Sequence, residues 1–371
     1  MLRYSASNFS TLYEKRSVKI TMKYASAISI TRYVLALFAI PAILACGYAH
    51  ATPVGTVVQL NEFSPEGPAL AVFNGKLFIA WTGTDGNHSL NVAESSDGLH
   101  FSNAVVFSGE SSIPTAAPSI VAFNGKMYLY WTGGFQDINV ATSTDGLHYA
   151  NKSLVESGGN VMTALGSTAV AVAHGHIYLS WAGTDSPHTI NVAESSDGVH
   201  FGTPTLITDP PGSGAGSNFS PGLAAISDGL EYTVFPAFTP ETTVKGPGVS
   251  VGHTTEVYPL NSSLGGANVS VKFPIIAAPN DDSFTGPDGP GCMVSTNALT
   301  CVYVDFATHL RIHSLLRNSS TGAVSNFGDE VIGNELAIGN PAIVDFNNRT
   351  IIAWTGTDGA HTINVGAFTS F

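Results

Sequence analysis

The chain has 371 residues, only 11% of them charged, and a formal net charge of −13 at pH 7. Six of its 14 Lys and Arg lie before residue 52 but only one of its 27 Asp and Glu, which leaves 8 basic and 26 acidic residues afterwards. A chain with this excess of acidic residues would repel phosphate backbones and anionic lipids. We therefore expect neither a nucleic-acid nor a membrane-surface function.

The first 51 residues resemble an export signal. Met22, Lys23 and Arg32 precede an apolar run over 33–46, and Ala49-His50-Ala51 has the small-x-small pattern of a cleavage site. The run is short for a membrane span, and no later segment is apolar enough to be one. We expect residues 1–51 to be a signal peptide, with Met22 as an alternative start, and 52–371 to form one secreted or periplasmic domain. A lipoprotein anchor at Cys46 is the alternative.

A 21-residue stretch beginning at Trp81 dominates the remaining sequence. It returns almost unchanged from Trp181, more loosely from Trp131, and in truncated form from Trp354, and the first three tryptophans are 50 residues apart. A period of this size indicates a solenoid or a propeller. Each copy contains four short strand patterns separated by turn signals such as Asn74-Gly75, with no room for a helix. The fold class predicted is therefore an all-β propeller with four-stranded blades.

The same rhythm continues through the divergent region after residue 208, giving a fourth blade from Pro221 and a fifth from Gly291. The last copy ends before its outer strand. Residues 56–60 resemble outer strands, so we expect the N-terminal strand to complete that blade and to close a ring of six blades, with five or seven as alternatives. Cys292 and Cys301 fall on paired strands of one hairpin, which predicts a cross-strand disulfide.

The turn Ser95-Ser96-Asp97-Gly98-Leu99-His100-Phe101 and its counterparts at 143–149 and 195–201 resemble the Asp-box, although they are one residue shorter between Asp and Gly. That motif is typical of sialidase-like secreted propellers, and the repetition is closest in style to repeat-built propeller lectins. The resemblance implies that each Asp accepts backbone N–H groups away from the active face, and we expect the neighbouring histidines to pack. Sialidase chemistry requires three arginines from different blades. After residue 51 the chain has only Arg311, Arg317 and Arg349, so we do not expect sialidase activity.

Consecutive hairpins alternate between two faces of a blade, so the turns between the second and third strands share a face with the connections between blades. Propellers usually bind ligands on that face. Carboxylates and imidazoles can bind sugar hydroxyls, and an indole can stack on a sugar ring. The candidate ligand-binding residues are Asp85, His88, Asp185, His188, Asp358, His361, Trp81, Trp181 and Trp354. The alternative is that Asp-Gly simply forms the turn and the tryptophans are core residues.

Glycoside hydrolysis needs one pair of carboxyl groups, whereas these acids recur from blade to blade. Repeated sites suit multivalent binding, so we expect a non-enzymatic, lectin-like protein with a glycan or polysaccharide partner and no catalytic residue. The alternative is a glycoside hydrolase or lyase with its site in blades 4 and 5, and a further alternative is a protein-binding scaffold. Other irregular acids are Glu62, Glu66, Asp281, Asp282 and Asp288. No cofactor is expected, with Ca²⁺ at the 280–288 loop as the minor alternative.

The residues that enter the innermost strands are uncharged, which argues against an acidic centre on the axis. They are Pro68, Pro118, Thr168, Pro221, Gly291 and Pro341.

Overall fold

The computed structural model divides the chain into two units, Met1–Ala51 and Thr52–Phe371. It describes residues 55–369, with gaps at 187, 208–219, 228–231, 239–255, 258–259, 262–274, 277–288, 296–297, 306 and 318–323. The predicted signal peptide and the acidic loop at 280–288 therefore lie outside the described residues. Within the described ranges no helix has the length and apolar character needed to cross a membrane.

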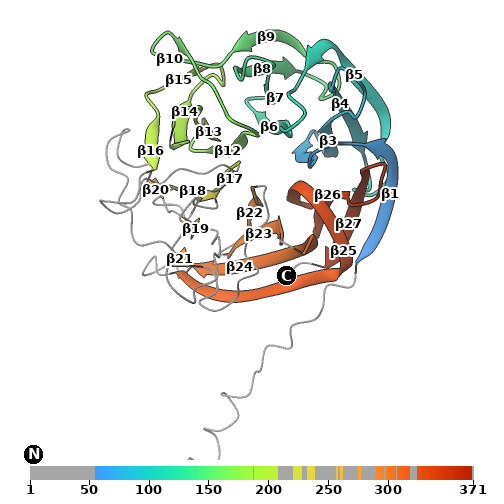
Figure 1. The fold of residues 1–371 in the computed structure, drawn as a ribbon. Helices are drawn as coiled ribbons and strands as arrows, with labels where there is room; N and C mark the ends of the chain where they lie inside the picture. Colours follow the sequence, from blue (N-terminus) through green and yellow to red (C-terminus); the bar gives the residue numbers. More distant parts are fainter. Residues whose placement is uncertain are drawn as a thin grey trace, which may run out of the picture. The chain divides into compact units, whose positions relative to one another are not determined.

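Apart from one parallel pair, β10 with β15, the described strands form antiparallel sheets, which are arranged one after another around a common axis (Figure 1). We call each radial group of strands a blade and name its strands a to d from the axis outwards. Blades 1 to 3 are consecutive four-stranded sheets with strands in sequence order. Blade 1 contains β2 (Ala69–Phe73), β3 (Lys76–Thr82), β4 (Ser89–Ser95) and β5 (Ser102–Ser111). Blade 2 contains β6 (Ser119–Phe123), β7 (Lys126–Thr132), β8 (Ile138–Ser143) and β9 (Ala150–Leu154). Blade 3 contains β12 (Ala169–Ala173), β13 (His176–Ala182), β14 (Ile190–Ser195) and β16 (Thr205–Ile207).

Shorter strands complete the middle of the chain. β10 (Glu156–Ser157), β11 (Asn160–Val161) and β15 (His200–Phe201) form a small sheet that joins the connection after blade 2 to blade 3. Blade 4 contains β17 (Gly222–Ser227), β18 (Tyr232–Phe238), β19 (Glu256–Val257), β20 (Leu260–Asn261) and β21 (Ile275–Ile276).

Blades 5 and 6 share one seven-stranded sheet. Blade 5 contains β22 (Gly291–Ser295), β23 (Ala298–Val304), β24 (His309–Arg317) and the first part of β25 (Val324–Phe346). The second part of β25 is strand a of blade 6, followed by β26 (Arg349–Gly356), β27 (Thr362–Thr369) and β1 (Thr56–Phe63). β1 pairs with β27, with Val58 opposite Val365, so the prediction that the N-terminal strand closes the ring is confirmed.

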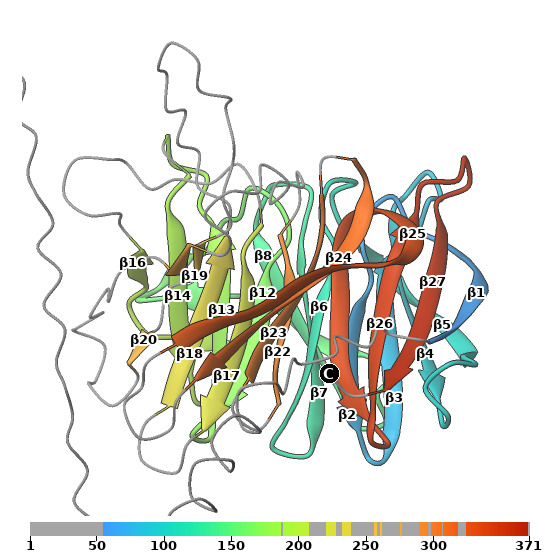
Figure 2. The same ribbon diagram turned by 90° about the horizontal axis from the view of Figure 1, so that it is seen from below.

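Because neighbouring strands are antiparallel, they run back and forth between two opposite faces of the ring (Figure 2). The a–b and c–d turns share one face, which we call the a–b face. The b–c turns and the d–a connections share the other, the b–c face. Threonines at the ends of three b strands link blades across this second face: Thr82 Oγ1 donates to Ala116 O at 2.9 Å, Thr132 Oγ1 to Gly166 O at 2.7 Å and Thr355 Oγ1 to Glu66 O at 2.6 Å.

The hydrophobic core lies between blades. Phe78 of blade 1 packs with Met127 and Leu129 of blade 2, and Tyr128 of blade 2 packs with Ile177 of blade 3. Successive side chains of strand b point to opposite faces of the blade, so each b strand packs against both neighbouring blades.

The axis ends in an open cavity of about 110 Å³, lined by the entrances of six innermost strands. The six expected entry residues are all among its lining, and no lining residue carries a charged side chain. The expectation of an uncharged axis is confirmed.

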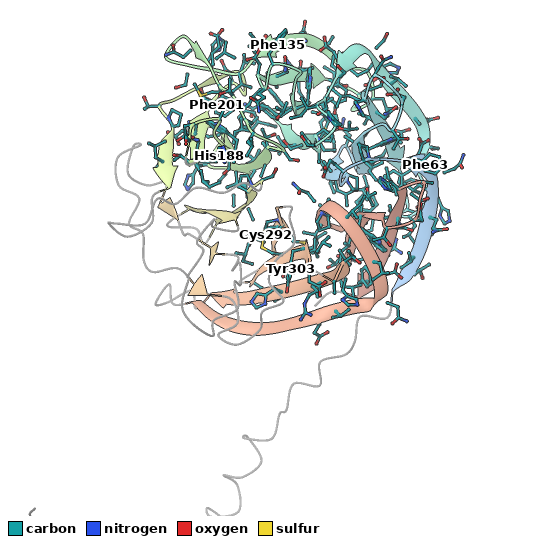
Figure 3. All side chains as sticks on the ribbon, in the orientation of Figure 1. Phe63, Phe135, His188, Phe201, Cys292 and Tyr303 are labelled. Carbon is teal, nitrogen blue, oxygen red and sulfur yellow. A yellow bond between two sulfur atoms is a disulfide. The ribbon has the colours of Figure 1, made fainter. Side chains whose placement is uncertain are left out.

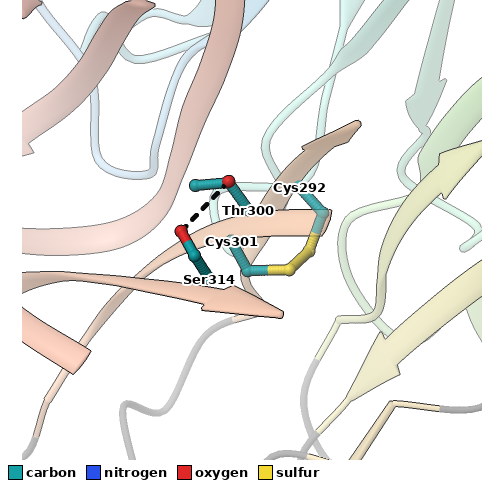
Figure 4. Close-up of a disulfide and its surroundings, with 4 residues drawn as sticks. All are labelled: Cys292, Thr300, Cys301 and Ser314. Atoms are coloured by element: carbon teal, nitrogen blue, oxygen red, sulfur yellow. Dashed lines mark hydrogen bonds between the residues drawn. A yellow bond between two sulfur atoms is a disulfide. The ribbon is translucent and has the colours of Figure 1, made fainter. Parts of the chain in front are cut away.

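A disulfide joins Cys292 of β22 to Cys301 of β23, which are directly opposite in the register (Figure 4). The predicted cross-strand bridge is confirmed. On the next strand pair, the hydroxyl oxygens of Thr300 and Ser314 are 3.2 Å apart. The innermost hairpin of blade 5 is thus closed covalently beside the axial cavity, since Cys292 is one of the residues that line it.

Candidate functional site

The predicted aspartates of the b–c turns hold the turns themselves. Backbone N–H groups of Ser89 and Thr189 donate to Oδ1 of Asp85 and Asp185, both at 2.9 Å. In the last copy Thr362 N donates to Asp358 Oδ1 at 3.2 Å. The hydrogen bond from Ser89 lowers the pKa of Asp85 from its ordinary value. Each carboxylate is therefore committed in part to its own loop.

The histidines of these turns occupy a left-handed backbone conformation. The φ angles of His88, His188 and His361 are 52°, 54° and 59°. Their N–H groups donate to the carbonyl oxygens of the turn aspartates at 3.0, 2.8 and 2.9 Å respectively. The three Asp/His turns lie on different blades, and within the described residues no group of three or more His, Cys, Asp or Glu could hold a metal ion. Their role as ligand contacts remains a prediction.

The tryptophans of the repeat are core residues. Trp81, Trp181 and Trp354 are 1%, 2% and 0% exposed, and Trp131 is 1% exposed. An indole enclosed between two sheets has no face open to a sugar ring. The prediction that Trp81, Trp181 and Trp354 stack on a ligand is therefore wrong.

Blades 1, 2, 3 and 6 share three residues around each b–c turn. Each has a Trp near the end of strand b, a Gly two residues later, and an Asn directly opposite the Trp on strand c. The glycines are Gly83, Gly133, Gly183 and Gly356, and the asparagines are Asn91, Asn139, Asn191 and Asn364. Each Asn Nδ2 donates to a carbonyl of its b–c turn at 2.7–2.9 Å.

The Gly and the Asn depend on each other. A Cβ on Gly133 would lie 2.7 Å from Asn139 Nδ2, and one on Gly83 would lie 3.0 Å from Asn91 Nδ2. A side chain at the Gly position therefore requires the Asn side chain to move or to be replaced.

Blade 5 replaces all three residues together. Tyr303 stands where the other blades have Trp, Asp305 replaces the Gly, and Arg311, opposite Tyr303, replaces the Asn. The alignment is supported by the backbone, since Asp305 N donates to His309 O at 3.0 Å just as Gly133 N donates to Asp137 O at 2.9 Å. This cluster is not evident from the strand pattern alone, because it emerges only when the positions of the Trp, Gly and Asn are aligned from blade to blade.

The replaced residues interact with one another. Arg311 Nη1 lies 3.6 Å from Asp305 Oδ2, and Arg311 Nε donates to the Tyr303 hydroxyl at 3.1 Å. His309 N donates to Asp305 Oδ1 at 2.8 Å, and His309 Nδ1 is 3.3 Å from Oδ2. The side chains of Asp305 and Arg311 are only 5% and 13% exposed, whereas His309 is 42% exposed. We call these four residues the blade 5 cluster (Tyr303 is labelled in Figure 3).

A half-buried glutamate lies beside this cluster. Leu336 pairs with His309, and Ala337 N donates to Thr308 O at 2.7 Å, so Glu335 belongs to the connection that borders the b–c turn of blade 5. Burial raises the pKa of Glu335 above its ordinary value. Burial also raises the pKa of Glu62, which lies on β1 at the outer edge of blade 6.

In the c–d turns, on the opposite face, each aspartate accepts backbone N–H groups, as expected. Leu99 N and His100 N donate to Asp97 Oδ1 at 2.9 and 2.8 Å, and Asp145 and Asp197 repeat the arrangement. His100, His148 and His200 do not pack, because their side chains are 72–74% exposed and bind the turn aspartates at 2.7–2.8 Å. That expectation is corrected. We call Asp97, Asp145 and Asp197 the c–d turn aspartates.

Comparison with known proteins identifies the fold. No family model matches the chain, and no curated protein matches it. Among solved structures, a Trypanosoma rangeli sialidase bound to the inhibitor DANA is similar with a TM-score of 0.55 and 11% identity, over 86% of this chain and 60% of that one. A Dyadobacter fermentans protein of unknown function is similar with a TM-score of 0.54 and 12% identity, over 85% and 98%. An endo-arabinanase from Bacillus licheniformis has a TM-score of 0.44 and 20% identity, over 72% and 98%.

The chain thus has the fold of the sialidase-like β-propellers. The comparisons contradict the prediction of a non-enzymatic lectin, because the structures of described activity that are similar with a TM-score above 0.5 are sialidases. The prediction relied on the repetition of the b–c turns. That repetition has a structural basis, because Asp85, Asp185 and Asp358 accept backbone N–H groups of their own turns.

Proposed function

We propose that this protein is a glycoside hydrolase whose site lies at the b–c end of blade 5. The observation that carries the proposal is the joint replacement of Trp, Gly and Asn by Tyr303, Asp305 and Arg311. Within the described residues this joint replacement occurs once, whereas the Asp/His turns recur. A glycoside hydrolase likewise has a single pair of catalytic carboxyl groups. The buried carboxylate of Asp305 also lies at the b–c end of the blade, on the face where propellers usually bind ligands.

Glu335 and Asp305 are the proposed pair of carboxyl groups. Two carboxyl groups with different surroundings can divide the roles of acid and base. The raised pKa of Glu335 suits a proton donor to the leaving oxygen. Asp305 is held by Arg311 and by the backbone N–H of His309, which suits the second carboxylate. The half-exposed His309 connects this otherwise buried group to solvent.

The chemistry of the chain favours a neutral substrate. It carries a net charge of −13, and only three arginines follow residue 51, so an acidic polysaccharide would meet a repelling surface. The signal-like first 51 residues support action outside the cytoplasm. The c–d turns, which we assign to a shortened Asp-box, lie on the opposite face and take no part in the reaction.

The test is release of reducing ends from neutral polysaccharides (arabinan, xylan, galactan and mixed-linkage glucan) and of 4-nitrophenol from the matching aryl glycosides. Glu335→Gln and Asp305→Asn should each lower kcat by at least about 100-fold. Glu62→Gln is the matched control, because it removes another half-buried carboxyl from the same face while leaving the blade 5 cluster intact.

Equal loss in Glu335→Gln and Glu62→Gln would contradict the assignment to blade 5, and absence of activity on the whole panel would contradict hydrolysis. Thermal unfolding of each variant distinguishes loss of chemistry from loss of folding. The first anomer released, followed by NMR, reports whether configuration is retained or inverted. An unsaturated product would instead identify a lyase.

A further inference from the structure

The b–c turn of blade 2 exposes a phenylalanine to solvent. Phe135 is 90% exposed, more than any other large apolar side chain in the described part of the chain, where the next are 54% exposed. Figure 3 shows it at the rim of the ring, near the position of β8 and β9. A side chain so exposed buries almost no area, so it contributes little to the stability of the fold. Its presence needs an explanation outside the core.

The turn that carries Phe135 differs from its counterparts. The first and third copies have Thr-Asp followed by a His at this place, whereas the second has Gly134-Phe135-Gln136 in a turn two residues shorter. Gly133 N donates to Asp137 O at 2.9 Å and Gln136 N donates to Gly133 O at 2.8 Å, with Gln136 at a φ of 64°. Ala164 N then donates to Gln136 O at 2.9 Å from the neighbouring connection. The aromatic ring is therefore presented by a turn that is fixed on both sides.

Neutral polar groups lie next to this turn. Thr163 forms an antiparallel bridge with Asp137 and also places its hydroxyl 2.8 Å from that of Thr184, in the b–c turn of blade 3. Both hydroxyls are exposed, and the turn of blade 3 continues into Asp185. An open aromatic face on a turn that adjoins exposed hydroxyl groups is a combination that binds a sugar ring, through stacking and through hydrogen bonds to its hydroxyls.

We propose that Phe135 and the Thr163–Thr184 pair form a secondary binding subsite for a neutral polysaccharide. Phe135 stacks on one sugar residue of the polymer while another residue occupies the blade 5 site on the same face. This inference rests on the proposed function and specifies it: the substrate is a polymer rather than a short glycoside, because only a polymer can reach from blade 5 to blade 2.

The experiment compares a polymer with a short substrate in the full chain. Phe135→Ala should raise KM for the hydrolysed polysaccharide about tenfold with kcat unchanged, while hydrolysis of the matching 4-nitrophenyl glycoside stays at the wild-type rate. Phe135→Trp, which keeps an aromatic ring at this position, should have a KM close to that of the wild type. Leu206→Ala is the matched control, since Leu206 is a 54% exposed apolar side chain on strand d of blade 3, outside the subsite.

An unchanged polymer KM in Phe135→Ala would overturn the subsite and would favour a protein partner for this aromatic, while activity on the aryl glycoside would leave the proposed function standing. A rise in KM with Leu206→Ala equal to that with Phe135→Ala would also overturn it. Affinity electrophoresis of Asp305→Asn in gels containing the polysaccharide gives a second readout without turnover. There, adding Phe135→Ala should abolish the retardation that the single variant retains.

Discussion

The contact between blades 2 and 3 includes a buried hydrogen bond whose contribution can be isolated. The hydroxyl of Tyr130, a 0% exposed residue of strand b in blade 2, donates to Gly198 O in the c–d turn of blade 3 at 2.7 Å. Burial raises the pKa of this hydroxyl well above its ordinary value, so it is a neutral donor at any pH at which the protein folds. Tyr130→Phe removes the donor and leaves the Gly198 carbonyl without it.

The expected cost is about 1–3 kcal/mol, the desolvation penalty of one buried polar group left without its partner. The shape of the core is conserved, so no cavity adds to this figure. Tyr149→Phe supplies the contrast. The Tyr149 hydroxyl is also buried, and among the described residues it has no hydrogen-bond partner. Its removal should be neutral or stabilise the fold by up to about 1 kcal/mol, because an unpaired polar atom leaves the core.

Urea unfolding followed by tryptophan fluorescence measures both variants. The midpoint should fall for Tyr130→Phe and hold or rise for Tyr149→Phe, with m-values equal to that of the wild type. Equal destabilisation by the two substitutions would refute the reasoning, since it would mean that the hydroxyls contribute by packing alone.

Four further predictions follow from the same structure. Gly146→Ala should lower the free energy of unfolding by several kcal/mol, because φ is +87° there and the new Cβ would lie 2.4 Å from the Phe78 ring. Gly125→Ala, where φ is +72° but the space around the Cβ is open, should lower it by only about 1 kcal/mol in the same urea assay. Replacing both half-cystines of the blade 5 disulfide by serine should lower the free energy of unfolding by about 2–3 kcal/mol, measured against the oxidised wild type, and no change would indicate that the hairpin is already ordered in the unfolded chain. Hydrogen bonds to the c–d turn aspartates lower their pKa values from the ordinary 3.8. Their contribution to stability is therefore present above pH 3.8 and is lost as the pH falls below it, so the Tm should fall on acidification. A Tm that rises from about pH 5 to about pH 3 would contradict this sign. Since burial raises the pKa of Glu335, the alkaline limb of kcat/KM should lie above the ordinary pKa of glutamate and should vanish in the residual activity of Glu335→Gln.

The sequence was sufficient to predict the architecture because the repeat is long, regular and rich in turn signals. Trp81 and Trp181 mark strand b, Asn74-Gly75 marks an a–b turn with φ angles of 48° and 74°, and the N-terminal strand was recognisable from its likeness to other outer strands. These are local properties that depend on a residue and its neighbours in the chain.

The candidate site was harder to predict because it depends on contacts across strands. Asp305 is six residues from Arg311 in the sequence, but only the register of β23 and β24 explains that they replace a Gly and an Asn together. The Asp/His turns attracted the functional prediction because they repeat and are polar. Their hydrogen bonds within the loop could not be distinguished from ligand contacts by residue type, since a carboxylate accepts a backbone N–H as readily as a sugar hydroxyl.

The long strand β25 has a consequence for how the protein is made. Its 23 residues belong to blade 5 at one end and to blade 6 at the other, and the same sheet takes in β1 from the beginning of the domain. β1 must therefore wait for β27, which is synthesised much later, before it can pair. Closure of the ring is therefore a late event that cannot precede the synthesis of β27, and a chain truncated before Thr362 would leave β1 without its partner strand.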